Sequence, residues 1–440
     1  MVEHSGAQRS GAAILPRRGL VAVLIGNALE FYDFLTFAFF APQIGRCFFP
    51  GTSEEDRLLL ALATFGAGFL TRPVGGMLLG RFADRRGRRP ALLLSFALMG
   101  VAIAGVGLTP GYATIGIAAP LLVLAFRLMQ GFALGGDVGA ATAYLIECAP
   151  PDRRGRFVSL QYVTQESANI VAGAIGAALA ALLSPAALDG WGWRVPFLLG
   201  ACIVPIGLVL RGQLHETLPA DDATTIMTPG SGVDDYRRAA ALGFVLLACG
   251  TIMTYGKLYI TIYAEVVLHM RVSIALAATA VVGLAGMIGS LLSGTLSDRF
   301  GRKPVILVAG ALVLVTTVPG FAMLGQQRTF ATLLTVSGLV SLLVAIAIAP
   351  VLVGLTETLP ARVRAGTVAI IYAFAIAVFG GSTQFLVAWL TKLSGSRLVP
   401  AWYMSGAALV SLAAALLLRE SAPRVLRARR IARLRAPVSV

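Results

Sequence analysis

Apolar runs of about twenty residues fill almost the whole 440-residue chain, and short polar turns separate them. A run of this length, wound into an α-helix, spans the hydrocarbon core of a bilayer, which is about 30 Å thick. Charged residues make up 13% of the chain and hydrophobic residues 57%, whereas soluble proteins contain about 25% charged residues. We therefore expect an all-α membrane protein with little chain left for a soluble domain.

The runs predict 12 transmembrane helices, six in each half of the chain. The first six are expected near residues 19–44, 57–82, 90–109, 115–148, 157–184 and 193–212. The second six are expected near residues 239–265, 274–297, 304–324, 329–356, 365–392 and 399–418. Residues 213–238 have the composition of a flexible polar linker. The predicted division is an N-terminal half (1–212), this linker (213–238), a C-terminal half (239–420) and a basic tail (421–440).

A basic loop after the second run recurs after the eighth. It reads GRFADRRGRRP at 80–90 and GTLSDRFGRKP at 294–304. Glycine lets two helix ends approach, proline suits the first turn of the next helix, and arginine stays out of lipid. The repeat therefore predicts two parallel halves. By the positive-inside rule the arginines mark the cytoplasmic side, where most of the 36 Lys and Arg residues and both termini are then expected.

Two functions are open for this loop: it can set the topology alone, or it can latch helices together in one conformational state. Asp84 and Asp298 are the candidates for the latch, because each is an acid among basic residues. The other candidate gating or structural residues of the two copies are Gly80, Arg85, Arg88, Gly294, Arg299 and Arg302.

The net charge of +15 suits anionic lipid headgroups better than nucleic acid, since the basic residues lie in turns between apolar runs and in the tail. The four cysteines have neither metal-ligand nor disulfide spacing, and no phosphate-binding loop is present. We expect no metal, no cofactor and no enzymatic activity, and an ion gradient as the energy source. We also expect a monomer and a first helix that is retained, since no A-x-A cleavage site follows it.

Polar side chains inside the apolar runs are the functional candidates. An ionisable group at the bilayer centre costs about 2.5–3.5 kcal/mol, so it must face a cavity or a partner. In the first run Asn27, Glu30 and Asp33 share a sector of about 120° on the helix surface. An acid there can carry a proton or pair with an arginine. Both interpretations stay open for Glu30, and proton coupling is favoured for Asp33.

The fourth run contributes Arg127, Gln130 and Asp137. A guanidinium group is planar and fits a carboxylate with two hydrogen bonds, so Arg127 is the candidate anchor for an anionic substrate. A permanent salt bridge to Asp33 or Asp137 is the alternative, and the two roles are compatible. In the second run Arg72 is expected to form a structural salt bridge with an acid of the first run.

The fifth run presents Gln165 and Asn169, with Gln161, on one face, and Glu166 beside them. Amides on one face suit hydroxyl and carboxylate groups of a substrate. Glycines further along the fifth run and in the eighth are expected to allow close helix crossing. They are Gly173, Gly176, Gly283, Gly286 and Gly289.

The seventh run carries Tyr255 and Tyr259 on one side and Lys257 on the other. A buried lysine needs an anion, which can be Glu166, an acid of the first run, or the substrate. We favour the substrate and keep the Glu166 pair as the alternative. Which side faces a central cavity is left open.

Several of these segments resemble the metabolite:proton symporter family of the major facilitator superfamily. They read GNALEFYDF from residue 26, RPVGG from 72 and RLMQGF from 127, and the repeated basic loop resembles the signature loop of the superfamily. The stretches 65–90, 161–176, 191–197 and 379–381 are similar to bacterial citrate and tricarballylate symporters. The resemblance implies a major facilitator fold in a bacterial inner membrane and adds Tyr32 as a substrate candidate.

Three residues depart from that resemblance. Asp137 stands where the family usually has glutamate, Glu166 where the citrate transporters have glutamine, and Lys257 lies in a helix that in them carries tyrosine and threonine around a proline. Asp33, Glu30, Asp137 and Glu166 are the candidates for proton coupling. The extra acid and the extra base leave the substrate identity open.

We accordingly expect a secondary transporter that imports a citrate-like tricarboxylate or another polyanion with protons. The alternative is proton symport of another small metabolite, such as a dicarboxylate, a 2-oxo acid, a monocarboxylate or a zwitterion. Moving one negative charge into a cell against 100 mV costs about 2.3 kcal/mol, so a polyanion needs accompanying cations. Protons are expected and sodium stays open. Fixed cations at Arg127 and Lys257 argue against export of cationic drugs, and a sensor would normally carry a signalling domain.

Overall fold

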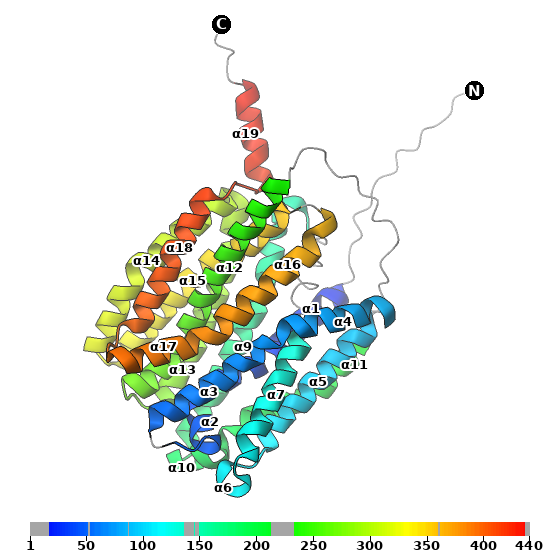
Figure 1. The fold of residues 1–440 in the computed structure, drawn as a ribbon. Helices are drawn as coiled ribbons and strands as arrows, with labels where there is room; N and C mark the ends of the chain where they lie inside the picture. Colours follow the sequence, from blue (N-terminus) through cyan, green and yellow to red (C-terminus); the bar gives the residue numbers. More distant parts are fainter. Residues whose placement is uncertain are drawn as a thin grey trace.

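The structure, a computed structural model, describes residues 17–51, 53–86, 88–135, 145, 149–212, 233–359 and 361–435. These residues form helices joined by short turns, and no strand occurs among them. The long helices lie side by side in one bundle (Figure 1).

The N-terminal half begins with a helix in two segments, α1 (Arg17–Phe39) and α2 (Ala41–Phe48). The following long helices are α3 (Glu54–Leu70) continued by α4 (Arg72–Arg86), α5 (Arg88–Leu108), α7 (Ala118–Leu134), α9 (Arg154–Leu182) and α11 (Arg194–Gly212). Short helical turns connect them: α6 (Tyr112–Ile115), η1 (Pro151–Arg153), α10 (Pro185–Ala187) and η2 (Leu188–Gly192).

The C-terminal half begins with α12 (Val233–Ile262), which η3 (Tyr263–Val267) extends as a π-helical turn. The next helices are α13 (Val272–Phe300), α14 (Arg302–Gln326), α15 (Phe330–Thr358), α16 (Ala361–Ala375), η4 (Ile376–Gly380), α17 (Gly381–Ser394) and α18 (Val399–Leu417). The basic tail forms α19 (Pro423–Arg435), which projects from the bundle (Figure 1).

Seven helices among the described residues are long and apolar enough to cross a membrane. They are Glu54–Phe82, Tyr236–Val267, Val272–Phe300, Arg302–Gln326, Phe330–Thr358, Thr367–Ser394 and Val399–Leu417. Two shorter apolar helices, Leu93–Leu108 and Ala118–Leu134, lie in the third and fourth predicted runs. The outward faces of the long helices expose large apolar side chains such as Val308 and Val315 of α14, which suits contact with lipid tails.

Most of the predicted linker, residues 213–232, lies outside the described residues. Residues 233–238 form the first turns of α12, so this helix begins earlier than predicted. The exact boundaries between the halves, the linker and the tail stay a prediction.

The bundle has two ends, the loop end and the far end. The loop end carries the turns between α4 and α5 and between α13 and α14, and α19 projects from it. The far end carries α2, α6 and α10, and lies at the bottom of Figure 1.

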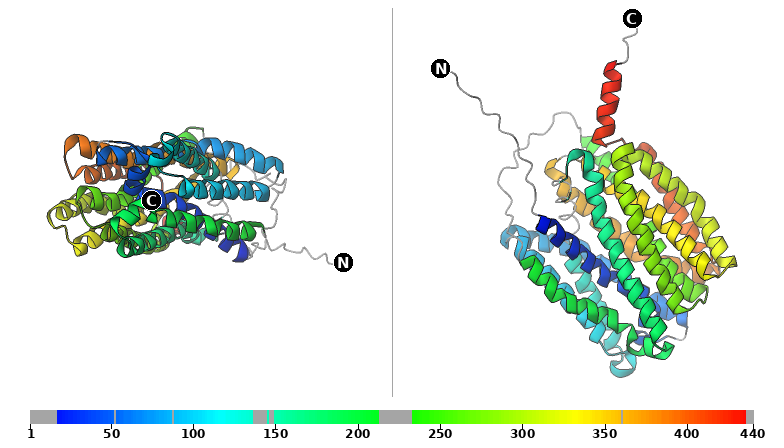
Figure 2. Two further views of the ribbon diagram at one scale, coloured as in Figure 1. Left: turned by 90° about the horizontal axis from the view of Figure 1, so that it is seen from below. Right: turned by 180° about the vertical axis from the view of Figure 1, so that it is seen from behind.

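The two halves meet most closely where α9 runs along α13 (Figure 2, right). A Cβ added at Gly173 would lie 2.5 Å from the backbone nitrogen of Ala280, and one at Gly283 would lie 2.7 Å from that of Ile170. Real Cβ atoms do not approach other atoms this closely. The predicted close helix crossing is therefore confirmed at Gly173 and Gly283.

Candidate substrate and proton site

Arg127 of α7 is fully buried among aromatic rings of the N-terminal half. Its guanidinium carbon lies 4.6 Å from the centre of the Phe34 ring, 4.4 Å from that of Phe37 and 5.1 Å from that of Phe65. Its Nη1 donates a hydrogen bond of 2.5 Å to Oε1 of Gln130, one helical turn further on. The rings stabilise the cation through their π faces. A fixed positive charge is thus held inside the bundle.

Arg72 at the start of α4 brings a second guanidinium to the same rings. It is buried and lies 4.6 Å from the centre of the Phe34 ring and 4.4 Å from that of Phe69. Phe34 of α1 therefore lies beside both arginines. This aromatic group around two cations, contributed by α1, α3, α4 and α7, is the strongest concentration of buried positive charge described in the N-terminal half.

Five predicted site residues cannot be compared with these contacts. The side chains of Glu30, Asp33, Asp84 and Arg88 and the whole of Asp137 lie outside the described residues. The salt bridges predicted between the acids of the first run and Arg72 or Arg127 therefore stay predictions.

Asn27 and Tyr32 bind neighbouring helices of their own half. The Asn27 amide nitrogen donates to the carbonyl of Gln161 at 3.1 Å and to the hydroxyl of Thr164 at 2.7 Å, both on α9. The Tyr32 hydroxyl donates to the carbonyl of Pro196 on α11 at 3.1 Å. These bonds hold α1 against α9 and α11. A substrate contact of either residue stays a prediction, as it does for the half-buried Gln165.

Lys257 and Glu166 form a buried ion pair between the two halves. The Lys257 Nζ of α12 lies 2.5 Å from Oε1 of Glu166 on α9 and donates a second bond of 3.1 Å to the Ser341 hydroxyl of α15. The Asn169 amide nitrogen donates to Oε2 of Glu166 at 2.8 Å. The lysine and glutamate side chains are 2% and 9% exposed. The structure therefore contains the pair that the sequence left as the alternative to a substrate contact.

The carboxylate of this pair lies directly against α13. A Cβ added at Gly286 would lie 2.5 Å from the carboxyl carbon of Glu166. Oδ1 of Asn169 has no hydrogen-bond partner among the described residues. This atom is thus an available acceptor, and a proton on Glu166 would supply a donor beside it.

Tyr255 faces the N-terminal half from the other side of α12. Its ring centre lies 5.4 Å from that of Phe69 and 6.2 Å from that of Phe65, both on α3. Tyr259, one turn further on, is 1% exposed. Because Lys257 contacts α9, both sides of α12 face the N-terminal half. The sequence left open which side of this helix faces inward, and in the structure the tyrosine side and the lysine side both do.

The repeated basic loop forms a charge cluster in its second copy. Arg302 binds Asp298 at 2.6 Å and donates two bonds, of 3.2 and 3.1 Å, to the carboxylate of Glu357. The Asp298 carboxylate also accepts from the backbone nitrogens of Gly155 at 2.9 Å and Arg156 at 3.0 Å, at the start of α9. Asp298 therefore joins the halves at the loop end, as a latch requires.

The two copies of the loop differ in their glycines. A Cβ at Gly294 would lie 2.9 Å from the Gly155 carbonyl oxygen, so α13 and α9 need glycine there. A Cβ at Gly80 would meet no described atom within 4 Å, so the close approach expected at this glycine is not found among the described residues. Arg85 is exposed, and so is Arg299, whose guanidinium lies 5.3 Å from the ring centre of its neighbour Phe300.

Sequence reasoning missed a polar cluster at the far end. Arg46 of α2 binds Glu54 at 2.6 Å and Asp189 at 2.8 Å, and lies 3.7 Å from Glu265 of η3. Gln43 of α2 donates to Glu265 at 3.0 Å. Each residue lies at the end of an apolar run, where polar side chains are ordinary. The available signal was an amide, Gln43, in the last turn of the first predicted run and an acid, Glu265, in the last turn of the seventh.

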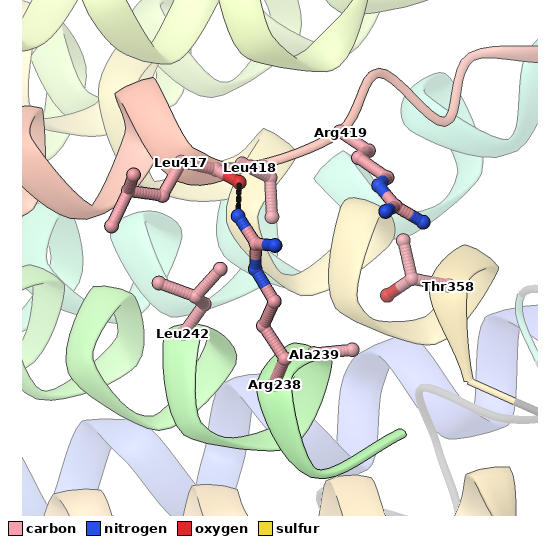
Figure 3. A pocket seen from close by; sticks show the side chains of 7 residues that line it. All are labelled: Arg238, Ala239, Leu242, Thr358, Leu417, Leu418 and Arg419. Atoms are coloured by element: carbon pink, nitrogen blue, oxygen red, sulfur yellow. Dashed lines mark hydrogen bonds between the residues drawn. The ribbon is translucent and has the colours of Figure 1, made fainter. Parts of the chain in front are cut away.

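One pocket lies apart from these clusters, and a small cavity lies beside Arg72. The pocket, of about 210 Å³, opens at the loop end between α12, α15 and α18, and Figure 3 shows Arg238 there reaching the carbonyl of Leu417 at 3.5 Å. Its lining includes no predicted substrate residue. The cavity, of about 20 Å³, lies between Arg72 and Tyr372. It has room for about one water molecule.

Comparison with known proteins agrees with this architecture. The chain is 36% identical over 422 residues to the citrate-proton symporter of Klebsiella pneumoniae, covering 94% of this chain and 93% of that one. It is 37% identical over 403 residues to the citrate-proton symporter of Salmonella typhi (91% and 93% covered) and 34% identical over 407 residues to the alpha-ketoglutarate permease of Escherichia coli K12 (91% and 93% covered).

The structure also resembles a crystal structure of a D-xylose-proton symporter. The TM-score is 0.74 at 18% sequence identity, with 92% of this chain and 98% of that chain covered. The predicted all-α fold of 12 helices in two halves is thereby confirmed. The sequence pattern of the Major Facilitator Superfamily matches residues 23–383, and the chain belongs to this superfamily of membrane transport proteins.

Proposed function

We propose that this transporter imports a citrate-like tricarboxylate together with protons by alternating access. The protein is proposed to lie in a bacterial inner membrane, with the loop end and both termini in the cytoplasm and the far end outside. The observation that carries the proposal is the fully buried Arg127, held among aromatic rings inside a major facilitator fold. A buried guanidinium suits a carboxylate, because it offers two parallel donors in a medium of low dielectric constant. The names of the relatives support the same substrate class.

Protons are the proposed coupling ions because a tricarboxylate carries several negative charges. Each negative charge that enters against 100 mV costs about 2.3 kcal/mol, and accompanying protons remove this cost. Asp33, Glu30, Asp137 and Glu166 are the proposed carriers. Glu166 has an observed arrangement that fits the role, since Lys257 holds its charged form and the Oδ1 of Asn169 lies ready for its protonated form.

A second candidate is import of an anion with fewer charges, such as a 2-oxo dicarboxylate. Lys257 is engaged by Glu166, which leaves Arg127 as the anchor nearest the aromatic group. With Lys257 engaged, fewer fixed cations remain for the substrate, which suits a dicarboxylate better than a tricarboxylate, and the alpha-ketoglutarate permease is a relative. In this alternative Glu166 and Lys257 are structural.

Uptake of radiolabelled substrates into proteoliposomes distinguishes these candidates. Citrate, tricarballylate, 2-oxoglutarate and succinate are offered with an imposed inward proton gradient, and in parallel with a sodium gradient. We expect accumulation of the tricarboxylates under the proton gradient. Accumulation of 2-oxoglutarate alone would select the second candidate, and accumulation that needs sodium would reject proton coupling.

A further inference from the structure

A buried contact between an amide and an acid joins the two halves at the far end. Gln43 of α2 is 0% exposed, and the side chain of Glu265 in η3 is 9% exposed. The Gln43 Nε2 donates a hydrogen bond of 3.0 Å to Oε1 of Glu265. Both segments depart from regular α-helix, since α1 breaks before α2 and η3 is a π-helical turn. Such turns occur frequently at functional sites.

One oxygen on each side of this contact lacks a partner. Oε2 of Glu265 and Oε1 of Gln43 are buried and accept no hydrogen bond from any described residue. Unsatisfied buried acceptors are rare and costly. A carboxylic acid and a primary amide can form a ring of two hydrogen bonds, in which the amide N–H donates to one acid oxygen and the acid O–H donates to the amide oxygen. The structure contains the first of these bonds, and a proton on Oε2 would provide the second.

The balance of charges around Glu265 also favours adding this proton. Arg46 of α2 is the cation that faces it, at 3.7 Å from Oε1. Arg46 binds Glu54 of α3 and Asp189 of η2 more closely, at 2.6 and 2.8 Å. Three carboxylates therefore share one arginine. Protonation of Glu265 removes one of three negative charges while Arg46 keeps its two closer partners.

We propose that Glu265 is a proton-binding residue of the transport cycle and that the far end closes on its protonated form. The proton comes from the solution at the far end and adds to Oε2, so Glu265 changes from charge −1 to 0 and no other bond breaks. When the far end is open, water solvates either form. When it closes, only the acid completes both hydrogen bonds with Gln43, so closure and protonation are linked. This inference rests on the proposed proton symport.

Distance measurements across the far end test the proposal without substrate. Spin labels are placed at A186C in the N-terminal half and S396C in the C-terminal half, both exposed positions, after the native cysteines are replaced by serine. We expect the closed population to fall as pH rises, with the open-to-closed ratio changing by up to about tenfold per pH unit, the limit for one linked proton. In E265Q, which is uncharged at every pH, the ratio should be independent of pH.

Two further variants distinguish loss of the hydrogen-bonded ring between Gln43 and Glu265 from a general weakening of the contacts between the halves. Q43L removes the amide, so the protonated acid can no longer complete the two hydrogen bonds and the closed population at acidic pH should fall. K392Q breaks the exposed ion pair of 2.6 Å between Lys392 of α17 and Asp56 of α3, which also joins the halves at this end. K392Q should keep the pH dependence of the parent protein.

Three results would overturn the proposal: closure of the parent protein that does not change with pH, pH-dependent closure that persists in E265Q, or a fall in the closed population at acidic pH that is as large in K392Q as in Q43L. Substrate uptake by the parent protein provides the separate test of the proposed function. Proton-driven uptake together with pH-independent closure would reject the role of Glu265 alone. A pH-dependent closure without any proton-coupled uptake would reject the proposed function alone.

Discussion

Arg127 is the residue on which the proposed substrate contact depends most directly. Its replacement by alanine removes charged hydrogen bonds to a carboxylate, each of which contributes about 1.5–3 kcal/mol. We expect R127A to weaken citrate binding at least about tenfold, and R127K to recover little because lysine lacks the planar fork. Calorimetric titration of the purified protein measures this. R328Q, which removes an arginine outside the membrane-spanning segments, is the matched control. Binding that survives in a folded R127A protein would contradict the anchor role.

The ion pair of Lys257 and Glu166 leads to a second prediction for substitutions of single residues. Removing one partner leaves an uncompensated buried charge, which costs about 3–5 kcal/mol, whereas removing both is nearly neutral. We expect K257M and E166Q each to lower the unfolding temperature and the double variant to recover most of the loss. If Lys257 also contacts the substrate, the double variant will lose more affinity for tricarboxylates than for monocarboxylates, each measured against the parent protein. Equal affinity changes for both classes would assign the pair a structural role only.

Asp33 is predicted to carry a proton, and D33N tests that role. The amide resembles a protonated carboxyl but cannot release a proton. We expect D33N to lose accumulation driven by a pH gradient and to retain exchange of labelled for unlabelled substrate between equal pools. Accumulation that persists in D33N would move the role to another acid, with Glu30 the next candidate.

Helix crossing at α9 and α13 gives a prediction at the scale of elements. A Cβ at Gly283 would lie 2.7 Å from the Ile170 nitrogen and 2.8 Å from the Glu166 carbonyl oxygen, and backbone cannot move aside as a side chain can. We expect G283A to separate the two helices and lower the unfolding temperature. G80A is the control, because its Cβ would meet no described atom within 4 Å. A helical Gly-to-Ala change without a clash stabilises by about 0.5–1 kcal/mol. Equal unfolding temperatures for the two variants would show that the crossing tolerates a methyl group.

The helices could be predicted from the sequence because each apolar run is as long as a bilayer is thick. The predicted run at 274–297 corresponds to α13, Val272–Phe300, with only small differences at its ends. The break before α2 has a signal in the sequence, Pro42 in the first turn of α2, whereas the π-helical turn η3 carries no distinctive residue pattern and could not be predicted. These two irregular segments hold Gln43 and Glu265. The sequence therefore located the helices but missed the contact that their irregular ends create.

The candidate site depends on contacts between segments that are distant in the chain. The sequence placed Lys257 and Glu166 among the alternatives because both are ionisable and buried, and charge balance then allowed their pairing. It could not predict the rings around Arg127, because a helix of apolar residues does not show which face meets which neighbour. The far-end contact joins residues 222 positions apart. Charge arguments from the sequence can therefore suggest candidate ion pairs, whereas the packing of side chains is known only from the structure.

At the scale of the whole molecule, contacts between the halves exist at both ends of the bundle. Asp298 binds the start of α9 at the loop end, and Gln43 binds Glu265 at the far end. Alternating access requires that the contacts at one end break while those at the other hold. The proposed transport cycle links the breaking of the far-end contacts to a proton and the central site to a carboxylate.

If carboxylate and protons enter together, adding substrate alone should drive protons across the membrane. Proteoliposomes with an internal pH dye receive an outside pulse of citrate while potassium and valinomycin hold the membrane potential at zero. We expect that the interior acidifies as citrate enters, with no requirement for sodium, and that R127A abolishes the signal. Citrate entry without acidification would contradict it.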